Sequence, residues 1–221
     1  MDTTPPVFNG PPEEAISLDS RACLARLAEL TAFENKYFGE CFAWSLEQTT
    51  RWAMSQATVH AAMTLGGSIV ASMSVFLVHS DSCKLLVSGK IRETELQPWL
   101  EGPSLTPPIV YFASVIASSK SYLPVLYNSL GRDTANLLQS YGIAAQEGLA
   151  IAACQAGRKH LERNGFRRAG DALYQNTHAI MRIRAHHART AFWRQVLAQN
   201  STPTAQPFAS YLFATRSPFS V

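Results

Sequence analysis

The chain has 221 residues, which is long enough to bury a sizeable hydrophobic core and predicts one domain with room for an appendage. Only 16% of the residues are charged, below the roughly 25% of a typical soluble domain, which indicates large buried surfaces or a partner interface. The formal net charge of +3 is too small to indicate a nucleic-acid-binding protein.

The first residues and the cysteines bear on where the protein resides. Residues 1–14 are acidic and rich in proline, so they predict a flexible leader and lack the basic and apolar regions of a signal peptide. No apolar run approaches the roughly 20 residues of a membrane-spanning helix. The four cysteines show no Cys-x-x-Cys spacing, which favours reduced thiols. We therefore expect a cytoplasmic protein with no membrane span.

The N-terminal part predicts a strand followed by two helices. Residues 15–18 form the expected strand, and apolar residues from Cys23 to Leu30 recur on one face of the first expected helix. A second helix is expected over roughly 36–56 and carries a wide aromatic stripe. That stripe either packs against a sheet or forms one wall of a substrate pocket.

A hairpin and an irregular segment come next. Two extended runs, 58–65 and 68–79, flank Gly66-Gly67, which suits a two-residue turn with positive φ angles. Residues 80–107 are rich in proline and predict a long loop around Trp99. A long irregular insertion in a compact domain is usually functional or disordered.

The second half of the chain predicts alternating strands and helices. Residues 108–118 are β-branched, aromatic and uncharged, and they predict the strongest strand. A serine-rich crossing, 118–130, leads to a helix expected over 131–146. The apolar run 149–154 predicts a buried strand, and the basic segment after it predicts a short helix ending at Asn164-Gly165.

Two more strands, 166–172 and 176–184, and a helix over 186–199 are expected near the end. The domain boundaries that follow are a leader at 1–14, a domain at 15–184 and a C-terminal helix and tail at 185–221. Aromatic residues of this last part are expected to pack on the domain or across a homodimer interface. They are Phe192, Trp193, Phe208, Tyr211 and Phe213.

The order of these elements, and the run from Gly148 to Asp171 with its short helix ending in Gly165-Phe166, resembles the GNAT acyltransferase superfamily over about residues 15–184. The resemblance implies an α/β (α+β) fold with a mixed, mostly antiparallel sheet flanked by helices. Two central parallel strands, here 109–118 and 149–154, would splay apart to admit the pantetheine arm of acyl-CoA. The backbone groups expected to bind the pantetheine amides are those of Ser114, Val115, Ile116 and Ala117.

The resemblance also implies a phosphate-binding loop directly before the helix that follows the long strand, where backbone amides and the helix dipole meet a pyrophosphate. The corresponding residues are Asn128, Ser129, Leu130, Gly131, Arg132 and Asp133. Only Gly131 matches the family pattern, and Asp133 stands where a small residue belongs.

Candidate catalytic residues follow from what amine acylation needs, which is a base for the ammonium proton and an acid for the departing thiolate. The tyrosine that serves as this acid in many GNAT members is replaced by Leu161, beside His160. The candidates are Tyr111, Cys154, His160 and Glu40, with Glu34, Glu47, Tyr122 and Tyr127 as further possibilities. Their commoner fates are core packing or a solvated surface. The histidines His178, His186 and His187 lack the spacing of a metal site, so no metal is expected.

These features favour an enzyme that transfers an acyl group from acetyl-CoA or another acyl-CoA to the amine of a small molecule or a protein. Two alternatives stay open. One is a catalytically inactive GNAT-fold binding or assembly module, because the phosphate loop is degenerate and the tyrosine is missing. The other takes the acyl group from an acidic acyl carrier protein, which would meet the basic residues Arg158, Lys159, Arg163, Arg167 and Arg168.

Overall fold

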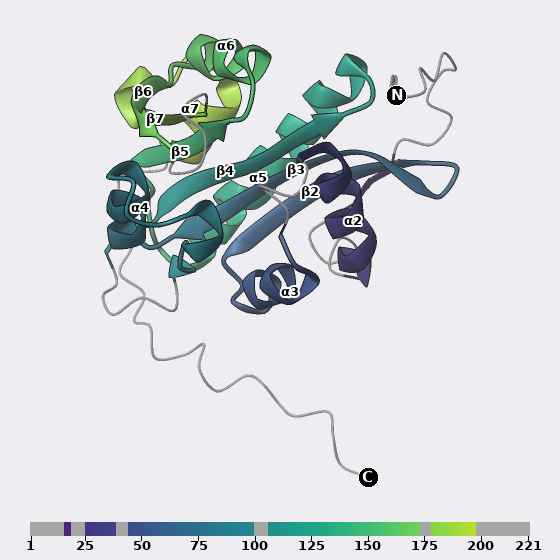
Figure 1. The fold of residues 1–221 in the computed structure, drawn as a ribbon. Helices are drawn as coiled ribbons and strands as arrows, with labels where there is room; N and C mark the ends of the chain where they lie inside the picture. The colour runs from purple at the N-terminus through teal and green to yellow at the C-terminus, as the bar shows by residue number, and fades with distance from the viewer. Residues whose placement is uncertain (1–15, 19–24, 39–43, 100–105, 173–177, 198–221) are drawn as a thin grey trace.

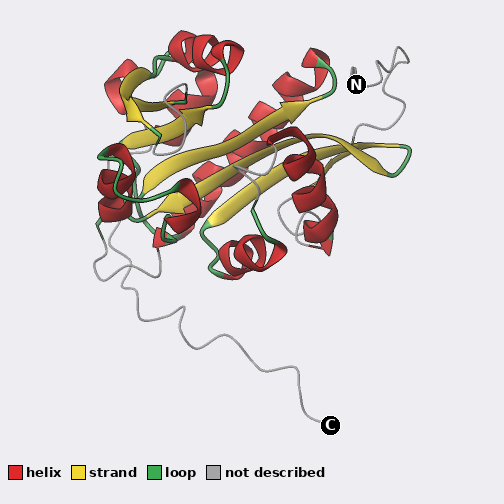
Figure 2. Cartoon of the chain, in the orientation of Figure 1, coloured by secondary structure: helices red, strands yellow, loops and turns green. Residues whose placement is uncertain are grey.

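The structure is a computed structural model, and it describes residues 16–18, 25–38, 44–99, 106–172 and 178–197. One mixed sheet of seven strands forms its centre, in the order β1-β2-β3-β4-β5-β7-β6 (Figures 1 and 2). The strands are β1 (Ile16–Leu18), β2 (Thr58–Leu65), β3 (Ser68–Val78), β4 (Ile109–Ala117), β5 (Glu147–Ala152), β6 (Arg167–Asp171) and β7 (Ala179–Arg184). Every neighbouring pair is antiparallel except β4 and β5, which are parallel.

Helices cover both faces of this sheet. Helices α2 (Leu27–Phe38) and α3 (Leu46–Met54) lie in front of the sheet in Figure 1, and α5 (Leu123–Ser140) lies behind it. The remaining helices are α4 (Ser80–Val87), α6 (Gln155–Asn164) and α7 (Ala191–Leu197), the last two beside β5, β6 and β7. No helix among the described residues is both long and apolar enough to cross a membrane.

The parallel strands β4 and β5 separate along their length. They pair at only three positions, from Val110 opposite Gly148 to Phe112 opposite Ala150, although β4 runs on to Ala117. The register between β3 and β4 shifts at the same level, because Ser74 faces Ser114 while Val75 faces Phe112, so that Ala113 has no counterpart. A bulge of this kind bends the strand and turns it from its neighbour. The expected adjacent, parallel and splayed pair is therefore confirmed.

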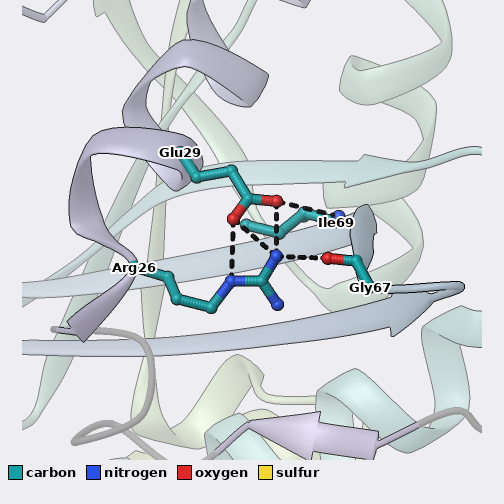
Figure 3. A network of polar contacts seen from close by, with 4 residues as sticks. All are labelled: Arg26, Glu29, Gly67 and Ile69. Carbon is teal, nitrogen blue, oxygen red and sulfur yellow. Dashed lines mark hydrogen bonds and ion pairs between the residues drawn. The ribbon is translucent and has the colours of Figure 1, made fainter.

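The strand order and this splayed pair confirm the expected mixed, mostly antiparallel α/β sheet. The Gly66-Gly67 hairpin also forms as predicted, with positive φ at both glycines. Its turn is tied to the start of α2 (Figure 3): the Arg26 guanidinium donates to the Gly67 carbonyl over 2.6 Å and pairs with Glu29, whose carboxylate accepts from the Ile69 amide over 3.3 Å. These contacts hold the start of α2 against the β2–β3 hairpin.

Two local predictions are wrong. The two expected N-terminal helices form with other bounds: α2 continues to Phe38, and the helix expected over 36–56 begins only at Leu46, because Ser45 and Gln48 form a capping box that starts α3. Residues 80–107 are not one long loop: they contain α4 and a 3-10 turn over Glu93–Glu95, and Pro98 bridges to Val78.

A third correction concerns the crossing after β4. A 3-10 turn over Lys120–Tyr122, capped by the Ser119 hydroxyl, leads directly into α5, whose Pro124 suits a helix start. The segment from Asn128 to Asp133, comprising Asn128, Ser129, Leu130, Gly131, Arg132 and Asp133, therefore lies inside α5 rather than before it. The backbone amides there are used within the helix, so the segment cannot form the expected phosphate loop. Gly131 instead lets α7 approach, because a Cβ there would lie 3.0 Å from the Phe192 ring.

The aromatic residues of α7 belong to the core of the domain. Trp193 is 1% exposed, with ring centroids 4.9 Å from Phe166 and 5.7 Å from Phe112. The hydrophobic core thus continues past Arg184, to Leu197. Phe208, Tyr211 and Phe213 lie outside the described residues, so their packing stays a prediction.

Trp193→Ala is expected to lower the free energy of unfolding by about 3–5 kcal/mol, because it empties a large buried site. The control is Met54→Ala, since Met54 is 78% exposed and its loss should change stability by less than about 0.5 kcal/mol. Urea unfolding followed by fluorescence measures both. A Trp193→Ala protein as stable as the parent would contradict the placement of α7.

Candidate active site

A pocket opens on the face of the sheet covered by α2 and α3, at the level where β4 leaves β5. It is lined from α2, the start of α3, the 3-10 turn after α4, and the strands on both sides of the splay. The lining residues are Thr31, Glu34, Asn35, Phe38, Trp44, Thr49, His60, Phe76, Glu93, Ala113, Ser114, Ile151 and Ala153. Two carboxylates face this pocket, and no described lining residue carries a positive charge at neutral pH.

Glu34 of α2 is held at the floor of the pocket by serines from the sheet. The hydroxyls of Ser72, Ser74 and Ser114 all donate to its Oε1 atom, over 3.0, 3.1 and 2.7 Å. No described residue donates to Oε2, so that oxygen is available to a ligand. Burial raises the pKa of Glu34, and the three serine hydrogen bonds oppose this rise. The result is a fixed carboxyl group in a weakly solvated site, next to the splay.

His60 of β2 extends this network and presents an acceptor. Its Nδ1 lies 2.8 Å from the Ser74 hydroxyl. Since that hydroxyl gives its hydrogen to Glu34, the His60 Nδ1 must be the donor, which leaves Nε2 without a hydrogen. Burial lowers the pKa of His60 to about 4, so the ring is neutral. Its Nε2 is buried, and none of the described residues forms a hydrogen bond to it. A buried acceptor that is left unpaired costs free energy unless a ligand fills the role.

Glu93 is the second carboxylate of the pocket. The Tyr111 phenol of β4 donates to its Oε1 over 2.6 Å. Burial raises the pKa of Glu93 to about 7; the Tyr111 bond opposes this, and the nearby Glu34 charge adds to it. Like charges in one site disfavour simultaneous ionisation, so the Glu34 charge helps to keep the proton on Glu93.

This raised pKa predicts a pH-dependent stability. Between about pH 4.5 and 7 the folded protein keeps a proton on Glu93 that the unfolded chain releases, so Glu93 favours folding below this window and progressively less through it. Glu93→Gln removes this loss, and its stability relative to the parent should rise by about 2–3 kcal/mol from pH 5 to pH 8, or roughly 5–10 °C in Tm.

Thermal unfolding of the parent, Glu93→Gln and the exposed control Glu47→Gln at both pH values measures this effect. The difference between parent and variant isolates Glu93 from His60, whose lowered pKa acts in the opposite direction between pH 6.5 and 4. A difference that stays constant with pH would contradict the burial of Glu93 as a carboxyl group.

Aromatic side chains form another part of the pocket lining. Trp44 and Phe76 lie edge to face at 5.3 Å between centroids, and Trp52 stacks behind Phe76 at 4.7 Å. The Asn35 side chain forms two hydrogen bonds with the Trp44 backbone: it donates to the carbonyl over 2.8 Å and accepts from the amide over 3.1 Å. Trp44 is thereby fixed relative to Glu34, the neighbour of Asn35 on α2.

The structure brings some of the predicted site residues together and separates others. Tyr111 and Ser114 contact the pocket carboxylates, while Val115, Ile116 and Ala117 continue along β4 past the splay. Cys154 is exposed at the N-cap of α6, where its Sγ accepts from the Gly157 amide over 3.3 Å. Glu40 lies outside the described residues.

His160 lies on the other side of the sheet, in contact with α5. Its Nε2 is hydrogen-bonded to the Tyr127 phenol, and the Asn164 amide is 3.3 Å away. Tyr127 in turn stacks on Phe112 of β4, at 6.0 Å between centroids. Leu161, in the position of the family tyrosine, is buried in the core. No group of three potential metal ligands occurs among the described residues.

Sequence reasoning missed Glu93 and His60 in this site. Glu93 lies in the segment predicted as a loop, where a glutamate carries no periodic signal. The serines of β3 did offer a signal: Ser72 and Ser74 are two residues apart, and hence on one face, in a strand that is apolar apart from them and Ser68 at its start. Small polar residues in a buried strand indicate a polar partner across the core.

The fold defined by this strand order and splayed parallel pair is that of the GNAT acyltransferases. No known family model matches the chain, and no curated protein matches its sequence. The chain is similar in structure to smu.2055 from Streptococcus mutans UA159, with 13% identity over 77% of this chain and 98% of that one, at a TM-score of 0.47.

Two further solved structures are similar to the chain. FeeM, an N-acyl amino acid synthase from uncultured soil microbes, has 9% identity over 83% of this chain and 95% of its own, at a TM-score of 0.47. The PaiA N-acetyltransferase of Thermoplasma acidophilum, in complex with coenzyme A, has 10% identity over 77% of this chain and 98% of its own, at a TM-score of 0.40. The fold is assigned from the strand order and the splayed parallel pair.

Proposed function

We propose that the protein is an acyltransferase that moves an acyl group from a thioester, acyl-CoA in the first instance, to an amine. The observation that carries the proposal is the position of Glu34, a fixed carboxyl group in a pocket that reaches the splay of β4 and β5. Amine acylation joins the nitrogen to the carbonyl carbon and releases a thiol. The nitrogen must first lose a proton, and a partly desolvated carboxylate suits that role.

The splay and the start of α5 fit a CoA thioester. Beyond Phe112 the edge of β4 is no longer paired with β5, and an extended pantetheine arm can pair with such an edge. The bulge at Ala113 lies on the pocket wall, so we assign its backbone amide to the thioester carbonyl. We assign the pyrophosphate site to the start of α5 in place of 128–133. There Ser119 and Lys120 precede the 18 residues of the helix.

Tyr127 and His160 are our candidates for the proton that the leaving thiolate takes up. They join α5 to α6 on the face of β4 opposite Glu34: the bulge at Ala113 places Phe112, on which Tyr127 stacks, opposite Val75, and Ser114, which bonds Glu34, opposite Ser74, and these neighbours in β3 point to opposite faces. Burial raises the pKa of the Tyr127 phenol, so it holds its proton at neutral pH. An acid and a base on opposite faces of the splay suit a reaction whose two partners enter from opposite sides.

Thiol release tests the proposal. Acetyl-, butanoyl- and octanoyl-CoA are mixed with a panel of primary amines at pH 8, and free thiol and amide product are measured. Amine-dependent thiol release with the matching amide is the expected result. The absence of turnover with every donor and amine would favour the non-catalytic module.

An acyl carrier protein is a second candidate donor, favoured by exposed cationic residues on α6 and β6. Lys159 and Arg163 are exposed on α6, and Arg167 is exposed on β6. Carrier-bound and CoA-bound octanoyl groups compared in the same assay separate the two donors. Lys159→Glu and Arg163→Glu together should slow transfer from the carrier about 10-fold or more without affecting transfer from CoA.

A further inference from the structure

The small net charge of the chain hides an uneven distribution of charge along it. Residues 155–221 hold ten of the Lys and Arg residues and only two of the Asp and Glu residues, whereas residues 1–154 hold nine and fourteen. The described part of this basic segment comprises α6, β6, β7, the turn after β7 and α7, which lie together beside β5 (Figure 1). The cationic side chains of the segment are therefore gathered in one part of the molecule.

Five basic side chains meet at the end of β7. This strand ends at Arg184, and the short 3-10 turn after it contains His186 and His187, whose ring centroids are 4.0 Å apart. Arg189 follows the turn, and Arg167 begins β6, the strand paired with β7. The pKa of His187 is lowered by desolvation and then by the charges close around it, which are those of His186, Arg167, Arg184 and Arg189. We call these five residues the basic cluster.

The basic cluster is fixed in place at a distance from the candidate active site. The Arg189 amide donates to the Asn164 carbonyl over 3.2 Å, which holds the turn after β7 against the end of α6. Arg184 pairs over 3.1 Å with Glu147, the first residue of β5, whereas the splay lies at the other end of that strand. The cluster is therefore a separate surface of the molecule.

Carboxylates neutralise only part of the basic cluster. Glu147 pairs with Arg184, but no carboxylate of the described residues pairs with Arg167 or Arg189, and both of these side chains are exposed. Like charges that gather on a surface repel one another in the free protein, and a bound anion relieves this repulsion. The electrostatics of the cluster thus suit an anionic partner.

The composition of the basic cluster restricts what that partner is. Three of its five residues are arginines, whose guanidinium groups bind phosphate through two parallel N–H donors. Protein interfaces and membrane-surface helices add large apolar side chains to their charges. The exposed large hydrophobic residues of the described chain lie elsewhere, on α2, α3, α4 and α5: Tyr37, Leu46, Met54, Leu85 and Val125. The cluster therefore fits a partner that is recognised through its phosphates.

The two histidine rings add flat surfaces to these charges. His186 is exposed and His187 is partly exposed. Unpaired bases stack on histidine rings and on guanidinium planes, whereas a duplex keeps its bases stacked inside. We infer that the basic cluster binds single-stranded nucleic acid, with its arginines on the phosphates and its histidine rings against the bases. This binding is independent of the proposed acyl transfer.

Fluorescence anisotropy of the full chain with a labelled oligouridylate of about 20 nucleotides tests the inference, with a Kd of about 1–100 µM expected near physiological salt. Arg167→Glu combined with Arg189→Glu should weaken binding at least about 10-fold. The slope of log Kd against log salt should fall by about 1.4, because each phosphate contact on a single strand contributes about 0.7.

A charge-matched control separates the cluster from the overall charge of the protein. Arg51→Glu combined with Arg132→Glu changes the net charge equally, at exposed positions on α3 and α5, and should bind as the parent does. Equal weakening by the two pairs of substitutions, or no binding by the parent at low salt, would overturn the inference. Each pair replaces exposed side chains, so the Tm should stay near that of the parent.

The histidines are tested by His186→Ala combined with His187→Ala, which should weaken binding of the single strand about 10-fold through the loss of stacking. Bound phosphates favour the charged form of His187, so the affinity of the parent should rise from pH 8 to pH 6, and the histidine variant should lose this rise. The arginines around His187 stay charged throughout this range. An affinity that does not change with pH, or tighter binding of a duplex, of phosphatidylserine vesicles or of an acyl carrier protein, would overturn the inference.

Discussion

Glu34→Gln is expected to lower kcat/KM for amine acylation by about 10²–10⁴-fold, because it removes the group that takes the proton from the nitrogen. The amide keeps a carbonyl oxygen that can accept the bonds from Ser72, Ser74 and Ser114, so the pocket keeps its shape. Thiol release at saturating donor and varied amine measures the effect, and Glu47→Gln should behave as the parent.

The pH profile distinguishes catalysis from support of the structure. A base at Glu34 requires kcat/KM of the parent to fall as the pH is lowered through the raised pKa of this residue. In Glu34→Gln the residual rate should lose this limb, while the Tm stays near that of the parent. A variant with the parental rate, or one that loses activity only by unfolding, would show that Glu34 does not act on the amine.

Gly165→Ala is expected to have the largest effect on stability, more than about 4 kcal/mol. Gly165 ends α6 with a φ of +103°, a conformation that side chains disfavour, and a Cβ there would lie 2.0 Å from the His187 carbonyl oxygen. That oxygen belongs to the backbone, so relief requires α6 to move away from residues 187–189. Tyr127 would then lose its contact with His160.

Gly142→Ala is the matched control for this substitution. Gly142 also has positive φ, +63°, but a Cβ there meets no atom of the described residues within 4 Å, so only the conformational cost of about 1 kcal/mol is expected. Chemical denaturation of the two variants beside the parent measures the difference. Similar losses in both would mean that the close packing of α6 against His187 is not what requires glycine.

The elements predicted well from the sequence are those with strong local signals. Gly66-Gly67 specified the hairpin, the uncharged run 108–118 specified β4, and Asn164-Gly165 marked the end of α6, where Gly165 adopts the left-handed conformation. Each signal depends on backbone conformations that only certain residue types adopt at low cost, so it survives without knowledge of the tertiary structure.

The start of α5 shows how a local signal can mislead. The serines from 118 to 121 suggested an extended polar crossing, whereas Ser119 caps the turn that leads into the helix and Pro124 lies in the first turn of α5. Serine favours both loops and helix caps, for the same reason: its hydroxyl binds nearby backbone groups. The position of Pro124 was the more informative signal, and it would have moved the helix start away from Gly131.

The pocket depends on contacts that no local pattern contains. Glu34 and Ser114 are 80 positions apart, and the bond between them requires the order of the strands β2, β3 and β4 and the placement of α2 over them. The sequence did indicate an acid on the N-terminal helices, but it favoured Glu40, with Glu34 and Glu47 only as further possibilities. Only the fold separates Glu34, which contacts three serines, from Glu47, which is exposed.

In the proposed reaction an amine at Glu34 meets a thioester in the splay of β4 and β5. A crystal structure with a non-transferable thioether analogue of acyl-CoA and a primary amine tests this arrangement most directly. We expect the amine nitrogen within hydrogen-bonding distance of Glu34 and the acyl end of the analogue beside Ala113 between the two strands. An amine bound elsewhere, or an analogue that leaves the splay empty, would contradict the account.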